Sequence, residues 1–137
     1  MKKLIIATAF ILLAGTAFSQ TLKKGNIIGV HHLTVTLKPD VTMDQYLDFT
    51  INTLFPEAEK AFPGVKAFIM QGGSGGATND YATLFYFESG EVFSKYFDAE
   101  DNLTIEGTAA MEKLGPTIEK LDELGTDTRE EFGWMIL

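Results

Sequence analysis

The stretch Asn26–Leu37 constrains the fold most, because its pattern is typical of a β-strand with two unlike faces. Side chains along a strand point to alternate faces. One face is apolar apart from His31, whereas the other mixes aliphatic side chains with His32, Thr34 and Thr36. We interpret the mixed face as the wall of a partly hydrated cavity, not as a surface packed against helices.

A helix is predicted after Lys38-Pro39-Asp40, which ends this strand. Thr42 followed by Gln45 is a capping box, the signature of a helix start. Pro56 lacks a backbone donor and is expected to kink or split the helix. Pro63-Gly64 should close the segment. An apolar stripe with helical spacing marks its buried side: Leu47, Ile51, Leu54, Phe55, Ala58 and Phe62.

Two strands, an interrupted helix and a last strand complete the pattern. Val65–Met70 and Tyr81–Glu88 are predicted to form a hairpin around a glycine-rich loop. Ser89 should cap a helix that 98–102 interrupts. A final strand is predicted from Phe132 to the end of the chain.

This order of elements is the βαββαβ pattern of a ferredoxin-like α+β fold. It predicts a four-stranded antiparallel sheet with helices on one face, in a single domain spanning 20–137. The other sheet face is too apolar to lie fully in water. Since the chain has no further layer, we expect a second copy to cover it, which gives a homodimer with a barrel-like interior.

The N-terminus has the three parts of a secretory signal peptide. Lys2 and Lys3 precede an almost continuously apolar run at Leu4–Ala14, and Ala17-Phe18-Ser19 fits a cleavage site before Gln20. A membrane anchor is the alternative, but a span needs about 20 apolar residues. We therefore expect residues 1–19 to be removed, leaving an exported protein, periplasmic or secreted, without a membrane span.

Charge and composition exclude several classes of function. The 137 residues include 11 Lys or Arg, 19 Asp or Glu and no cysteine, with a net charge of −8. Nucleic-acid binding needs a basic face, so it is not expected. Disulfides, thiolate nucleophiles and cysteine-ligated metals are excluded. The acidic excess between Asp98 and Glu131 is either a solvated helix face or a docking surface for a basic partner.

Three segments resemble the dimeric α+β barrel superfamily, which includes stress-responsive barrel proteins and antibiotic-biosynthesis-type and haem-degrading monooxygenases. His32–Val41 resembles its first strand and the entry to its first helix, and Pro63-Gly64-Val65 resembles the turn into its second strand. Ala82–Ser89 resembles its third strand. The family contains enzymes and proteins of no known activity, so the resemblance implies the fold and leaves the function open.

His32 is the main catalytic candidate. An imidazole on the mixed face could act as a general base, and the family often has a histidine near this position. The alternative is a structural histidine bonded to a neighbouring hydroxyl or carbonyl group. His31 should lie on the opposite face, packed or exposed. The residues expected to bind a ligand in the barrel are His32, Thr34, Phe68, Tyr86 and Trp134.

No metal site or cofactor is expected. Adjacent strand residues point apart, so His31 and His32 cannot grip one ion together. Asn52 and Trp134 are only loose counterparts of the residues that haem-degrading relatives need. A cluster of oxygen ligands could form a weak calcium site or simply an acidic loop, and EF-hand spacing fails there. The cluster comprises Asp98, Glu100, Asp101, Asn102 and Glu106.

Three functions remain open from the sequence. The first is a binding or structural protein whose barrel cavity holds a small apolar or aromatic ligand. The second is a cofactor-free monooxygenase or isomerase that acts on an aromatic or polyketide-like substrate with His32 as base. The third is a docking protein that uses its acidic helix. The glycine-rich loop at 71–80 is interpreted as a hairpin tip, or as a lid over the cavity.

Overall fold

The computed structural model describes residues 22–73 and 80–135, with side chains described as far as Thr128. The predicted signal peptide at 1–19 and most of the glycine-rich loop lie outside these residues, so both remain predictions. No helix in the described part of the chain is long and apolar enough to cross a membrane.

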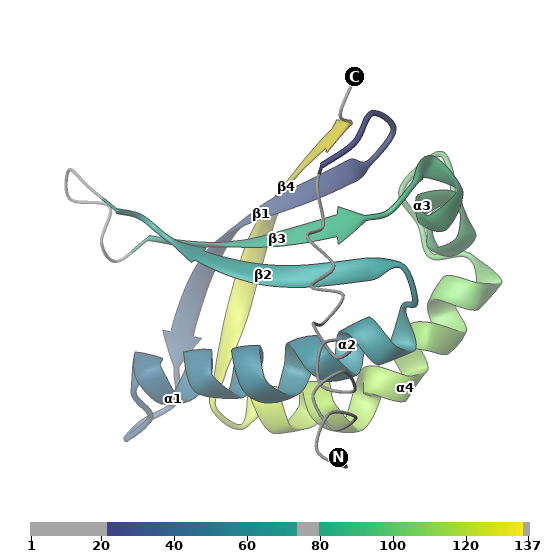
Figure 1. The fold of residues 1–137 in the computed structure, drawn as a ribbon. Coiled ribbons are helices and arrows are strands. Elements are labelled where there is room, and N and C mark those ends of the chain that lie inside the picture. Colours follow the sequence, from purple (N-terminus) through teal and green to yellow (C-terminus); the bar gives the residue numbers. More distant parts are fainter. Residues whose placement is uncertain (1–21, 74–79, 136–137) are drawn as a thin grey trace, which may run out of the picture.

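The structure is one four-stranded antiparallel sheet in the order β2-β3-β1-β4. Figure 1 shows the helices gathered on one side of this sheet. This arrangement confirms the predicted ferredoxin-like βαββαβ fold. In chain order the elements are β1 (Ile27–Leu37), α1 (Met43–Phe49), the π-helical turn η1 (Thr50–Leu54), α2 (Phe55–Ala61), β2 (Val65–Gln71), β3 (Tyr81–Phe87), α3 (Gly90–Tyr96), α4 (Ile105–Asp122) and β4 (Gly125–Met135).

The first helical segment begins at the predicted capping box. The Gln45 backbone N–H donates to Thr42 Oγ1 at 3.3 Å, and the Thr42 N–H donates to Gln45 Oε1 at 2.8 Å. Pro56 does not break the helix. The helix instead widens into η1 just before the proline, where the Phe55 N–H donates to the Thr50 carbonyl. A wider turn accommodates a residue that has no N–H to give.

The predicted apolar stripe is wrong at one position. Ile51 is 46% exposed, whereas Tyr46 and Thr50 are buried. The reason is η1, because its wider turn rotates the residues on either side of it relative to a regular α-helix. Leu54, Phe55 and Phe62 are buried as predicted.

The last strand is longer than predicted. It begins at Gly125, not at Phe132, and pairs with β1 along its whole length, from Leu37 opposite Gly125 to Ile27 opposite Met135. The polar residues that follow Gly125 hide the strand from a search for apolar alternation. Pairing with a central strand overrides that weak local signal.

The two faces of β1 differ as the alternation predicts. Leu33 is buried at 5% exposure on the face toward the helices, while His32 and Thr34 beside it are exposed on the opposite face. We call this opposite face the open face, because no element within 22–73 and 80–135 covers it (Figure 1). The apolar core therefore lies between the sheet and the helices.

Candidate functional site

A cavity of about 660 Å³ lies between the sheet and the helices, and we call it the sheet–helix cavity. Its volume is within the range of small-molecule sites, about 300–1,000 Å³. Strands and helices both contribute to its wall, which is mostly apolar. Representative wall residues are Ile27, Phe55, Phe85, Phe93, Leu114 and Ile118.

Two paired glycines explain why the sheet is hollow here. Gly29 of β1 lies opposite Gly133 of β4, and its other neighbour is Phe85 of β3. Neither glycine can place a side chain over the helix-facing side of the sheet. A Cβ built on Gly29 would meet only the His31 ring, with Nε2 at 3.4 Å. The pairing joins residues far apart in the sequence, so local patterns could not reveal it.

His31 is the histidine that lines the sheet–helix cavity. Its ring makes an edge-on contact with Phe85, with the centroids 5.3 Å apart. Thr83 lies opposite His31 in the sheet, and its buried hydroxyl has no hydrogen-bond partner among the described residues. The imidazole in the cavity thus belongs to His31, which the sequence placed on the face opposite His32 as packed or exposed, and not to the catalytic candidate His32.

One end of the cavity is polar. Asp127 of β4 lines it and lies opposite Val35, on the helix-facing side of the sheet. The Tyr46 hydroxyl donates to Asp127 Oδ2 at 2.8 Å, and Tyr46 itself is 1% exposed. A buried phenol therefore joins α1 to the first part of β4. Sequence reasoning missed this pair, because it began the last strand only at Phe132.

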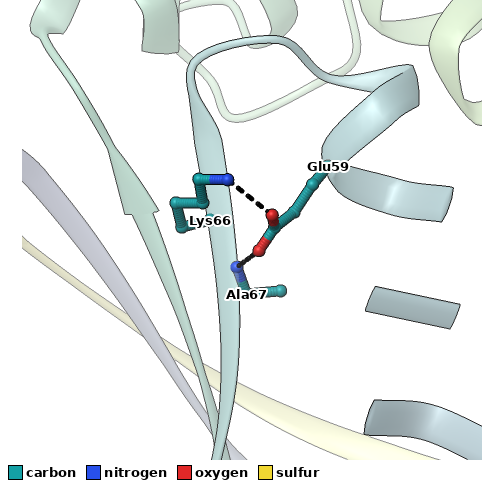
Figure 2. A network of polar contacts seen from close by, with 3 residues as sticks. All are labelled: Glu59, Lys66 and Ala67. Atoms are coloured by element: carbon teal, nitrogen blue, oxygen red, sulfur yellow. Dashed lines mark hydrogen bonds and ion pairs between the residues drawn. The ribbon is translucent and has the colours of Figure 1, made fainter. Parts of the chain in front are cut away.

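Glu59 forms a closed polar contact at the side of the cavity, beside strand β2 (Figure 2). Its Oε2 lies 2.6 Å from Lys66 Nζ, and its Oε1 accepts the Ala67 backbone N–H at 3.2 Å. Both carboxylate oxygens are thus engaged, one by a cation and one by the edge of the sheet. This contact ties α2 to β2 and offsets the charge of Glu59.

The predicted ligand-binding residues lie on the open face. His32, Thr34 and Phe68 are exposed there, with Phe68 at 48%, and Tyr86 shares that face in register with Ile28. The fifth residue, Trp134, also pairs with Ile28 through its backbone, and its side chain lies outside the described set. In a single chain His32, Thr34 and Phe68 are thus open to solvent, whereas Tyr86 is buried, at 8% exposure. The catalytic and binding roles predicted for them remain predictions.

The acidic cluster at 98–102 is organised by its own backbone. Asp98 Oδ1 accepts the N–H groups of Asn102 at 2.9 Å and Glu100 at 3.0 Å. These donors, Asn102 first, hold the pKa of the Asp98 carboxyl below its usual 3.8. Within the described residues, no three histidine, aspartate or glutamate side chains are grouped to hold a metal ion. Asn52, the loose haem counterpart, is exposed and donates to Asp48.

Comparison with family models and with curated proteins gives no match. Solved structures give weak similarities. A dimeric ferredoxin-like protein of unknown function from Bacteroides fragilis has 15% identity and a TM-score of 0.43, covering 82% of this chain and 98% of its own. A dimeric ferredoxin-like protein from Thermobifida fusca has 18% identity and a TM-score of 0.40, covering 83% and 97%.

A third solved structure is SnoaB, a cofactor-independent oxygenase from Streptomyces nogalater. It has 16% identity and a TM-score of 0.39, covering 79% of this chain and 91% of its own. The chain has a ferredoxin-like fold. That conclusion rests on its own strand order and element order, because similarities at this level identify neither a family nor an activity.

Proposed function

We propose that this protein binds a small apolar or aromatic molecule in the sheet–helix cavity. The observation that carries the proposal is a cavity of about 660 Å³ with a mostly apolar wall and His31 among its few polar groups. Binding sites for small molecules combine these features, an apolar wall for affinity and a few polar groups for orientation.

This location differs from the barrel interior that the sequence predicts, and the two faces of β1 allow a direct test. The probe is N-phenyl-1-naphthylamine, a neutral aromatic dye that brightens in apolar surroundings. Gly29→Val adds volume to the sheet–helix cavity without backbone strain, whereas His32→Ala changes only the open face. Fluorescence titration of both variants and the wild type measures the dissociation constants.

We expect Gly29→Val to weaken dye binding about tenfold or more, because filling a packed site costs about 1–3 kcal/mol. His32→Ala should bind as the wild type does. Weakening by His32→Ala alone would place the ligand on the open face and support the barrel interior. If the wild type binds no dye, the proposed function is wrong.

A cofactor-free monooxygenase or isomerase with His32 as base is the second candidate. The observation in its favour is an exposed imidazole that shares the open face with Thr34 and Tyr86. Oxygen uptake with a panel of polycyclic phenols tests the oxygenase. Loss of uptake in His32→Ala, with the sedimentation of the protein unchanged, would support this role. Equal uptake in both proteins would contradict it.

A further inference from the structure

The loop between α3 and α4 contains the triplet Asn102-Leu103-Thr104. An asparagine followed two positions later by serine or threonine, with any residue except proline between them, is the acceptor pattern for N-linked glycosylation. The other asparagines of the chain, at positions 26, 52 and 79, are not followed by serine or threonine at that spacing. The sequence therefore offers this pattern at one place, in the loop that joins the two helices.

Asn102 lies on the surface, where a glycan needs to be. Its side chain is exposed, and Leu103 beside it is 36% exposed. Asn26, in contrast, is 3% exposed, and its amide donates to the Glu88 carbonyl oxygen at 2.7 Å. Since α3 and α4 belong to the helix side of the sheet (Figure 1), a glycan on the loop between them leaves the open face free.

The side-chain amide of Asn102 contributes little to the loop. Asp98 Oδ1 holds the loop by accepting the backbone N–H groups of Glu100 at 3.0 Å and Asn102 at 2.9 Å. Asn102 Nδ2 lies 3.4 Å from each Asp98 carboxylate oxygen, which is long for a hydrogen bond between N–H and oxygen. A sugar on Nδ2 replaces one of the two amide hydrogens and leaves the backbone bonds in place. The folded loop therefore tolerates this modification.

The hydroxyl of Thr104, in contrast, is engaged in the folded chain. It donates to the Lys95 carbonyl oxygen at 2.5 Å and accepts the Gly107 backbone N–H at 3.1 Å, as the N-cap of α4. Because the acceptor pattern requires a hydroxyl at this position, a transferase must reach it while it is free. The attachment of a glycan must therefore precede the formation of the first turn of α4.

We propose that Asn102 is the acceptor of an N-linked glycan, attached during export and before α4 folds. The transfer forms a bond between Asn102 Nδ2 and the anomeric carbon of a sugar. The donor is an oligosaccharide diphosphate carried on a lipid. The bond between the anomeric carbon and the diphosphate oxygen breaks, the lipid diphosphate leaves with the electron pair, and the amide proton passes to a base of the transferase. The proposal rests on the predicted export of the chain.

Peptide mass spectrometry of the full chain, purified from its own host, tests the proposal. We expect the wild-type peptide that contains Asn102 to carry the added mass of an oligosaccharide. Asn102→Gln should lose this mass entirely. Asn52→Gln is the matched control, because Asn52 is also exposed but is followed by Leu54 at the second position, and it should keep the mass.

Two substitutions at Thr104 separate the acceptor pattern from the helix cap. Thr104→Ser keeps both, whereas Thr104→Asp keeps a good N-cap residue and removes the pattern. We expect the serine variant to carry the glycan and the aspartate variant to carry none, while both give the wild-type circular dichroism spectrum. A glycan that persists in Thr104→Asp would contradict the proposal.

The wild-type chain alone decides the main point, so a variant that fails to fold leaves the test intact. An unmodified Asn102 peptide from the host would overturn the proposal, as would an oligosaccharide that remains on Asn102→Gln. A chain expressed without residues 1–19 should stay unmodified. A glycan at Asn102 in that shortened chain would show that attachment does not depend on export, and the proposal would be wrong.

Discussion

At the scale of single residues, Gly107 sets how closely α4 approaches the end of α3. A Cβ built on this buried glycine would lie 2.2 Å from the Tyr96 carbonyl oxygen and 3.0 Å from Leu103 Cδ2. The same carbonyl accepts the Thr104 N–H at 3.0 Å, so it cannot move aside without loss of that bond. The absence of a side chain at 107 is therefore a packing requirement.

We expect Gly107→Ala to lower the free energy of unfolding by about 1–3 kcal/mol, the usual effect of overpacking. The sign is opposite to helix propensity, which favours alanine over glycine by about 1 kcal/mol. Gly90→Ala is the control: it lies in the first turn of α3 with nothing within 4 Å, and should be neutral or slightly stabilising. Urea unfolding measures both, and equal effects would contradict the prediction.

The two histidines show what a local sequence pattern can and cannot predict about a single residue. Alternation along β1 correctly assigns His31 and His32 to opposite faces. It does not say which face borders a cavity, because that depends on Gly29 meeting Gly133 across the sheet. The same limit applies to Tyr46 and Asp127, which meet through folding and share no local motif.

At the scale of elements, the first helical segment joins two α-helices, α1 and α2, that need different rotations about the helix axis to bury their side chains. Tyr46 and Thr50 are buried before η1, and Leu54 and Phe55 are buried after it. A π-helical turn holds about one residue more than an α-helical turn. That extra residue lets both halves turn their buried side chains toward the core.

The deletion of exposed Thr53, combined with Pro56→Ala, should therefore convert η1 into regular α-helix while both buried faces stay in place. We expect the free energy of unfolding to change by about 1 kcal/mol or less, since the alanine restores a backbone donor. The same deletion at exposed Glu112 rotates the following half of α4 by about 100° and should unfold the protein. Urea unfolding measures both variants. Similar losses would contradict a one-residue excess in η1.

Element prediction succeeds here where a segment carries its own local signal. The capping box at Thr42 and the cap at Ser89 both form as predicted, with Ser89 Oγ accepting the Val92 N–H at 3.2 Å. The prediction fails for the first half of β4, because its polar side chains carry no apolar pattern and its pairing partners are far away in the sequence. Thr126, for example, pairs with Thr36, which precedes it by 90 residues. Long-range pairing is the information that a local pattern lacks.

At the scale of the whole molecule, the open face is the surface that one chain leaves uncovered. Phe68 and Met70 of β2 are 48% and 38% exposed there. Ile28 and Leu84 are half-buried beside them, while His32 and the threonines of β1 form the polar part. An apolar half next to a polar half is consistent with the predicted pairing of two copies, in which the apolar halves meet.

We expect the protein to sediment as a dimer at micromolar concentration, and Phe68→Glu to shift it toward monomer. A carboxylate at this position would be buried without a partner in the paired sheets, which is strongly unfavourable. Ile105→Glu is the matched control, because Ile105 is an equally apolar residue that is 87% exposed on α4, on the helix side of the molecule (Figure 1). Analytical ultracentrifugation of the three proteins measures the association. If the wild type is a monomer, the open face is covered in another way, and the prediction of a barrel interior with His32 at its wall is wrong. If Ile105→Glu alone dissociates the dimer, the interface lies on the helices.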